Sequence, residues 1–310
     1  TTGAWKTLLV GGLNKGGRGF YALDVTDPTN PKGLWEACSD PTMCSISDPD
    51  FGFSYGNAVI TKRAFDGRWV VLLTSGINNV TPGDGQGYLF VLDAFTGETL
   101  RKVSTGAGDT TTPAGLSKIS AFADNFNINN TATFIYGGDL LGNLWRFDMS
   151  VDPPRVLRLA ELKDAAGGNP QSITSRPELG VFDSKRVVFV GTGRYLGEDD
   201  LPDPATLSLQ WAYQQSFYAI KDPFDLTVVG DDGHGDIRSI ATNGLVEQEL
   251  TDNGTSRTIT NNPVPSTALG WVVDFNPNST SPGERVNLDP QLVLGTIVVV
   301  TNVPNNNACT

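Results

Sequence analysis

The chain lacks several residue types and motifs on which common enzyme classes depend. It has one histidine, His234, and three cysteines in 310 residues, which argues against histidine acid–base catalysis and against a zinc site. Gly-x-Ser-x-Gly, a phosphate-binding loop and Cys-x-x-Cys are all missing. No run of about 18 apolar residues occurs, so no membrane-spanning helix is predicted. Carboxylate chemistry is the class that these absences leave open.

Basic clusters are missing too. The chain has 22 Lys and Arg and 34 Asp and Glu, which gives a net charge of −12, and it contains no run of Lys or Arg. A nucleic-acid-binding surface is therefore not predicted. Proteins, cations or surfaces are the expected partners. With 39% hydrophobic residues over this length the chain can bury a sizeable core without a metal or an oligomer.

The chain repeats one local pattern, a short apolar strand, a glycine-rich turn and a second strand that carries an aromatic residue. Glycine and Asp or Asn between such runs indicate a β-hairpin, because they accept the backbone of a tight turn. The centre of the pattern is Thr133–Met149, where Gly137-Gly138-Asp139 and Gly142-Asn143 separate the runs. The other copies are Leu8–Asp24, Trp69–Asp93, and Val187–Gly193 with Gln215–Ile220.

These copies recur at roughly 55 to 65 residues without any helical period, which favours propeller blades over a sandwich. The predicted fold is an all-β propeller with long inserted loops, forming a single domain over residues 1–310. Phe51–Ile60 is predicted as a strand and Thr251–Pro265 as a surface loop. Leu292–Val300 is predicted as a final strand without its hairpin partner, so the last blade is expected to be incomplete.

Two of the cysteines are predicted to form a disulfide. Cys38 and Cys44 lie six positions apart in a polar loop that contains a proline, where a bridge closes easily and suits an oxidising compartment. Two free thiols are the alternative. Cys309 is left without a partner in this sequence.

One loop has the spacing of a calcium site. Asn125, Asn127, Asn129 and Thr133 place oxygen-bearing side chains at loop positions 1, 3, 5 and 9. All four are neutral, and Asp124 is the nearest carboxylate. An Asn-rich loop that bonds its own backbone is the alternative.

Other acidic residues have structural interpretations. Asp231–Asp236 is expected to be a solvated glycine turn. Asp24, Asp93 and Asp148 end corresponding strands, where a paired-carboxylate glycosidase is conceivable, but repetition once per copy favours turn capping. The aromatic residues at equivalent places, Tyr21, Tyr88, Trp145 and Phe217, are expected in the core.

The ordered motifs resemble the C-terminal propeller domain of the PilY/PilC family of type IV pilus tip-associated adhesin and biogenesis proteins. The resemblance rests on Gly16–Thr26, Tyr136–Asp148, Thr174–Glu178, Gly191–Gly197 and Gln215–Ala219, and it covers nearly the whole chain. It implies seven blades and a fragment of a longer secreted protein with an N-terminal adhesive region. That protein would sit at the pilus tip, outer membrane or periplasm of a Gram-negative bacterium.

The same resemblance implies a non-enzymatic function. Such proteins prime pilus assembly with minor pilins, contact the major pilin, and support adhesion, twitching motility and the control of extension and retraction. Family members carry Asp-rich calcium positions where this chain has Asn125, Asn127, Asn129 and Thr133, so calcium is a doubtful cofactor here. A quinoprotein-like dehydrogenase and a carbohydrate-binding lectin, the latter using Leu209–Tyr213, remain the alternatives.

Overall fold

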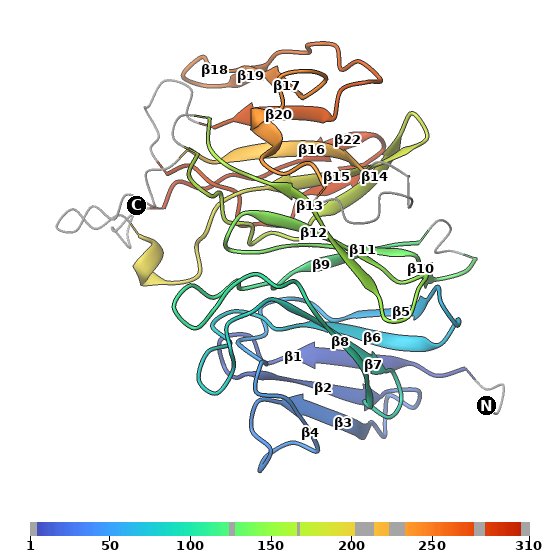
Figure 1. The fold of residues 1–310 in the computed structure, drawn as a ribbon. Coiled ribbons are helices and arrows are strands. Elements are labelled where there is room, and N and C mark those ends of the chain that lie inside the picture. The colour runs from blue at the N-terminus through green and yellow to red at the C-terminus, as the bar shows by residue number, and fades with distance from the viewer. Residues whose placement is uncertain are drawn as a thin grey trace. The chain divides into compact units, whose positions relative to one another are not determined.

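The computed structural model describes residues 5–123, 128–165, 168–201, 214–222, 233–275 and 283–304. Strands dominate these residues (Figure 1), and the described helices are two short 3-10 turns, η1 (Glu198–Asp200) and η3 (Ile237–Ser239). Contacts divide the chain into two compact units, Thr1–Gly137 with Arg146–Val156, and Gly138–Trp145 with Leu157–Thr310. In the described residues no helix has the length and hydrophobicity to cross a membrane.

The first two sheets belong to the first unit. The first has the order β1 (Leu8–Gly12), β2 (Gly19–Asp24), β3 (Lys32–Cys38), β4 (Ile46–Ser47). The second has the order β10 (Thr131–Ala132), β5 (Val59–Arg63), β6 (Trp69–Thr74), β7 (Tyr88–Asp93), β8 (Thr99–Ser104).

Two further sheets follow along the chain. The third has the order β13 (Arg155–Glu161), β12 (Asn143–Asp148), β11 (Phe134–Gly138), β9 (Ile119–Phe122). The fourth has the order β14 (Glu178–Phe182), β15 (Lys185–Gly191), β16 (Ser216–Asp222), β20 (Gly270–Asp274), β17 (Leu245–Gln248). Two hairpins complete the described strands, β18 (Leu250–Asp252) with β19 (Arg257–Ile259) and β21 (Gln291–Val293) with β22 (Thr296–Val298).

The repeated hairpins of the sequence form neighbouring strands of these sheets. Leu8 pairs with Asp24, Val70 with Asp93 and Val188 with Ile220, each time between antiparallel neighbours. Runs of antiparallel neighbours, β1 to β3, β5 to β8 and β14 to β16, give these sheets the meander connectivity of a propeller blade. Strands β4, β10 and β17 join the edges of their sheets in parallel. The predicted hairpins are therefore confirmed.

Burial on both faces explains the most apolar strands of the first unit. Residues Val70–Leu73 of β6 and Leu89–Leu92 of β7 are all at most 1% exposed, as expected for strands covered on both sides. Phe51 stacks on Phe90 with ring centroids 4.3 Å apart. Each such side chain contributes about 2 kcal/mol through burial.

The strand predicted over Phe51–Ile60 is wrong for most of its length. Regular pairing begins only at β5, and Phe53 makes a single isolated bridge to Ile77. The small residues serve close backbone crossings instead: a Cβ at Gly52 would lie 2.4 Å from the Ile77 carbonyl oxygen, and one at Gly56 would lie 1.7 Å from that of Ser117. Alternation of small and large residues therefore marked packed loops, not a strand.

The two predictions for the C-terminal part also need correction. Thr251–Pro265 is not simply a loop, because β18 and β19 pair within it. Leu292–Val300 is not one strand without a partner, because β21 and β22 form a hairpin around Leu294 and Gly295, whose φ angles are +50° and +80°. A glycine between two apolar triplets was the signal for that turn.

Candidate functional site

The predicted calcium loop is partly outside the described residues, which exclude Asp124, Asn125 and Asn127. Asn129 and Thr133 are described. The Asn129 Oδ1 accepts a hydrogen bond from the Thr131 hydroxyl at 2.7 Å. The main chain of Thr133 donates to the Phe122 carbonyl at 3.1 Å and accepts from the Met149 N–H at 2.8 Å. This end of the loop is thus held by a local hydrogen bond between two side chains and by backbone hydrogen bonds to Phe122 and Met149.

The donor set does not fit calcium. Loop positions 1, 3, 5 and 9 carry amides and a hydroxyl, whereas calcium affinity rises with the number of carboxylates. The described amide, Asn129, already accepts a local hydrogen bond. Within the described ranges, no group of three or more His, Cys, Asp or Glu could hold a metal.

Calcium is accordingly expected to leave the stability of the chain unchanged. A site with a dissociation constant of about 0.1 mM would add about 1.4 kcal/mol at about 1 mM calcium. Thermal unfolding in calcium and in EDTA is the measurement, and the same midpoint is expected in both. A calcium-dependent rise that disappears in Asp124→Asn would contradict the assignment.

The cysteine pair lies at the end of the first sheet. Cys38 ends β3, and its sulfur is bonded to that of Cys44, which precedes β4. The intervening turn is also closed by Asp40, whose Oδ1 accepts from the Thr42 N–H at 2.8 Å and whose carbonyl accepts from the Cys44 N–H at 3.2 Å. Cys309 lies outside the described residues.

Removing this disulfide is expected to destabilise the first sheet. The loop is short, so loop-closure entropy predicts a loss of about 2 kcal/mol in unfolding free energy for Cys38→Ser with Cys44→Ser. Urea unfolding measures it, with Cys309→Ser as the matched control that should leave the midpoint unchanged. Equal midpoints for the double variant and the control would refute the prediction.

The acidic residues that end corresponding strands cap turns, as predicted. The Oδ1 of Asp24 accepts from the Thr26 N–H at 2.9 Å, and that of Asp148 from the Ser150 N–H at 2.9 Å. Asp93 accepts from the N–H groups of residues 95 and 96 at 2.9 and 2.8 Å. These carboxylates therefore stabilise the blade turns.

The aromatic residues at equivalent strand positions differ in burial. Trp145 and Phe217 are 5% and 2% exposed, which confirms their predicted place in the core. Tyr21 and Tyr88 are half-buried, and the Tyr88 hydroxyl donates to Asp84 at 2.6 Å. The predicted sugar-stacking segment, Leu209–Tyr213, lies outside the described residues.

The central turn is built around a buried carboxylate, Asp139. Its Oδ1 accepts from the N–H groups of Leu141 and Asn143, each at 2.9 Å. Its Oδ2 accepts from the Asn143 side chain at 2.9 Å and from the Trp145 indole at 2.8 Å. Burial raises the pKa of Asp139 to about 6, while the bonds from Asn143 and Trp145 oppose that rise. Asp139 is therefore ionised at neutral pH and fully occupied by donors.

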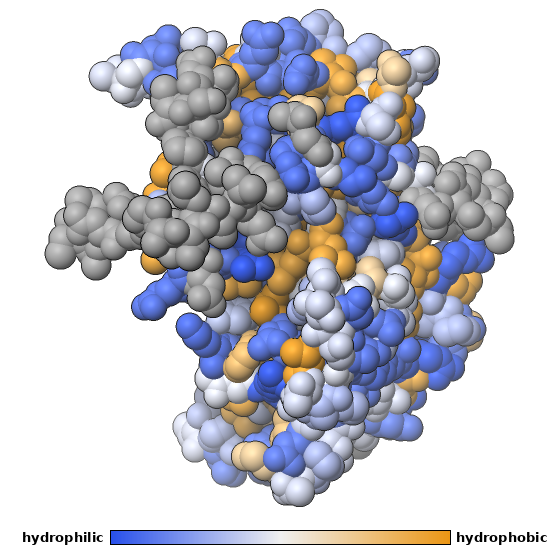
Figure 2. Space-filling model, turned by 60° about the vertical axis from the view of Figure 1, so that its left-hand side comes forward, coloured by the Kyte–Doolittle hydropathy of each residue, from blue (hydrophilic) through white to orange (hydrophobic). Residues whose placement is uncertain are grey.

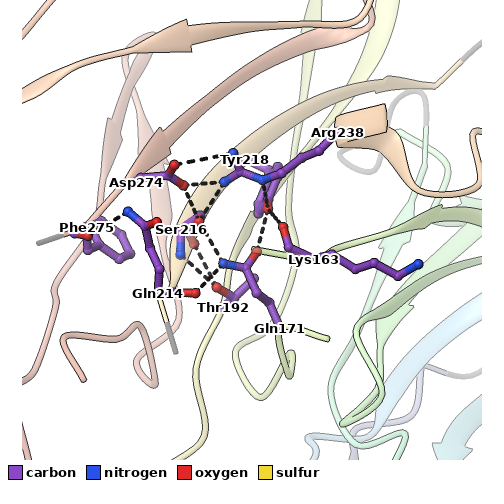
Figure 3. A network of polar contacts seen from close by, with 9 residues as sticks. All are labelled: Lys163, Gln171, Thr192, Gln214, Ser216, Tyr218, Arg238, Asp274 and Phe275. Carbon is purple, nitrogen blue, oxygen red and sulfur yellow. Dashed lines mark hydrogen bonds and ion pairs between the residues drawn. The ribbon is translucent and has the colours of Figure 1, made fainter. Parts of the chain in front are cut away.

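A second buried network surrounds Arg238 in the second unit (Figure 3). Arg238 extends from η3 and forms an ion pair with Asp274 of β20. It also donates to the Ser216 hydroxyl at 2.9 Å and, through Nε, to the Tyr218 hydroxyl at 2.9 Å. The guanidinium thus joins η3 to β16 and β20 at one point.

Gln171 extends this network into the preceding loop (Figure 3). Its side-chain amide donates to the Gln214 carbonyl at 2.6 Å and to the Ser216 hydroxyl at 2.9 Å. Its Oε1 accepts from the Tyr218 hydroxyl. Burial raises the pKa of Tyr218 to about 12, so the phenol stays neutral. Burial alone would lower the pKa of Arg238, but Tyr218 and Asp274 raise it.

A polar pocket of about 380 Å³ lies beside this network. Arg238, Asp164, Asp236 and Glu247 are among the residues that line it. Asp236 caps η3 by accepting a hydrogen bond from the Arg238 N–H at 3.2 Å. The last residue of the turn predicted over Asp231–Asp236 therefore has a structural role. Residues 231 and 232 of that turn lie outside the described residues. Three of these groups have partners outside the lining: Arg238 pairs with Asp274, Asp236 with Lys163, and Asp164 accepts from the Asn169 side chain. These contacts stabilise the fold.

Comparison with known proteins gives a consistent result. A profile of the PilY1 beta-propeller domain matches residues 1–262. The type IV pilus biogenesis factor PilY1 of Pseudomonas aeruginosa is 30% identical over 99% of this chain and 28% of its own length. A PilY1 homolog of Xylella fastidiosa is 29% identical over 97% of this chain and 20% of its own length. The chain thus spans less than a third of these relatives.

The fold agrees with a solved structure. The crystal structure of the P. aeruginosa PilY1 C-terminal domain matches with a TM-score of 0.77 and 30% identity, over 98% of this chain and 66% of that one. The predicted all-β propeller is thereby confirmed. Its seven blades and the single domain over residues 1–310 stay predictions.

Proposed function

The chain belongs to the PilY1 β-propeller family, and we propose on that basis that it is a non-enzymatic component of type IV pilus biogenesis. The supporting observation is the 30% identity over nearly the whole chain to a pilus biogenesis factor. The function includes priming of pilus assembly with minor pilins and support of adhesion, twitching motility and the control of extension and retraction. The proposed place of action is extracytoplasmic, at the pilus tip, at the outer membrane or in the periplasm.

The roles of the acidic residues agree with a binding function. Asp24, Asp93 and Asp148 cap turns, and Asp139 is occupied by four donors. The blades thus form a rigid support whose connecting loops are available to protein partners. Minor pilins and the major pilin are the proposed partners, and a surface ligand would bind elsewhere in the longer protein.

Calcium has no part in this proposal. The donor set at residues 125, 127, 129 and 133 is neutral and does not fit that ion. Regulation in this protein is therefore proposed to be independent of calcium at this loop.

An in-frame deletion of this region from the native gene tests the proposed function. Cells should lose surface pili and twitching, and expression of the intact protein in trans should restore both. A matched control carries Lys6→Met, a change at an exposed ion pair, and should keep wild-type piliation. Normal pili in the deletion strain would contradict the proposal.

A further inference from the structure

One face of the fourth sheet is apolar across neighbouring strands. The register places Phe189 of β15 opposite Ala219 of β16, and Ala219 opposite Trp271 of β20, so the three side chains share a face. Phe217, on the same face, belongs to a buried cluster that Val286 closes from the C-terminal segment. This end of the face is covered by the chain itself.

The other end of the same face is an open groove of about 240 Å³. Phe182 and Trp271 line it from the sheet, and Leu292 and Ile297 line it from the hairpin of β21 and β22, which lies against β14 (Figure 1). Phe182 is 61% exposed at its edge. Hydrophobic residues also reach the surface between hydrophilic ones on the face shown in Figure 2. The volume is below the roughly 300 Å³ of small-molecule pockets and suits one or two side chains.

Lys221 is the charged residue of this groove among the described residues that line it. Its ammonium donates to the carbonyls of Pro265 at 3.0 Å and Ser266 at 3.5 Å. In the described part of the chain no carboxylate lies within ion-pair distance of it. An ammonium has three donors, so one stays available for a ligand.

The surroundings of Lys221 favour an anionic ligand. Burial lowers the pKa of Lys221; Lys185 lowers it further, and Asp183 raises it. A buried cation without an anionic partner is costly, and a carboxylate ligand would relieve that cost. The rest of the chain is strongly acidic, with a net charge of −12, so this apolar, cationic groove differs from the average surface.

We propose that this groove binds an acidic segment of a partner protein, which inserts an apolar side chain between Phe182 and Ile297 and presents a carboxylate to Lys221. Buried anchors in desolvated pockets dominate the binding energy of protein interfaces, and a charge-assisted hydrogen bond is stronger than a neutral one. The inference goes beyond the proposed function, which names the connecting loops in general but no particular groove for a partner.

Peptide binding to the full 310-residue chain tests this inference. The probe is the acetylated, amidated hexapeptide TVFDVT, and TVFNVT is the uncharged control. Methyl resonances of Leu292 and Ile297 report the groove by NMR. We expect TVFDVT to shift both methyls and to bind about tenfold more tightly than TVFNVT, because a hydrogen bond to a charged group contributes about 1.5 kcal/mol.

Variants separate the charge from the groove. Lys221→Met should bind the two peptides equally, whereas Lys32→Met, which removes an exposed charge at the start of β3, should keep the preference. Phe182→Ser at the exposed edge, where folding is not at risk, should weaken both peptides.

Three results would overturn the inference. The first is equal binding of the two peptides to the unaltered chain. The second is a set of peptide-induced NMR shifts that does not include the methyls of Leu292 and Ile297. The third is a shift of these methyls with protein concentration alone, which would assign the groove to a second copy of the chain. Because the isolated chain is used, any of these results leaves the proposed pilus function standing.

Discussion

Asp139→Asn is expected to lower the free energy of unfolding by about 3 kcal/mol at pH 7. All four positions around the carboxylate are donors, so the amide NH₂ of asparagine would face an N–H wherever it is placed. The loss corresponds to one or two hydrogen bonds to a charged group. Urea unfolding measures it, and Asp27→Asn, at an exposed turn where Asp27 accepts from the Thr29 N–H, is the control with an expected loss below about 1 kcal/mol.

The difference between wild type and Asp139→Asn should also depend on pH. The pKa of Asp139 in the folded chain, about 6, lies above the value of about 3.9 for an unfolded chain. The folded state therefore binds the proton more readily, and this contribution to stability is fully present below about pH 4 and lost as pH rises through about 6. Asparagine does not titrate, so the difference should be larger at pH 4 than at pH 7 by about 2 kcal/mol.

The opposite trend would contradict this account of Asp139. A difference that shrinks as pH falls would mean that the four donors hold the pKa below its unfolded value, and that burial is the weaker influence. The unfolding free energies of wild type and Asp139→Asn should be measured over the same pH range, because the titration of all other groups then cancels in their difference.

Arg238→Met is expected to cost about 3 to 5 kcal/mol of unfolding free energy. The change leaves the Asp274 carboxylate, 17% exposed, without its cation, and breaking a buried pair from one side is strongly destabilising. It also removes the donor to the buried Tyr218 hydroxyl. Lys6→Met, at the exposed pair with Asp24, is the control and should cost less than about 1 kcal/mol.

A double-mutant cycle separates the ion pair from general disruption. Arg238→Met combined with Asp274→Leu replaces both charges with apolar side chains, so it should be more stable than Arg238→Met alone. Losses that simply add, as for residues that do not interact, would show that the pair is not what holds η3 to the fourth sheet.

The sequence predicted the parts of the fold that depend on local pattern. Glycine turns between apolar runs located the hairpins at Leu8–Asp24 and Trp69–Asp93, because turn backbone and strand burial are both encoded locally. The capping roles of Asp24 and Asp93 followed from their repetition at equivalent strand ends. The hairpin around Leu294 and Gly295 was missed, because two apolar triplets with one glycine between them also read as a continuous strand.

The buried networks could not be predicted, because they depend on residues far apart in the chain. Arg238 lies in a segment without any repeat, and its partner Asp274 is 36 positions away. Tyr218 belongs to a repeated motif, but its contact with Gln171 is set by tertiary packing. The groove at Lys221 likewise forms only when a later hairpin folds over the fourth sheet.

Filaments sheared from native cells provide the most direct test of a pilus function. The full-length protein, detected with an antibody against this domain, should be recovered with the filament fraction and be absent from it in a strain without the major pilin. Recovery that does not depend on pilin, or no recovery from piliated cells, would contradict the function proposed for this chain.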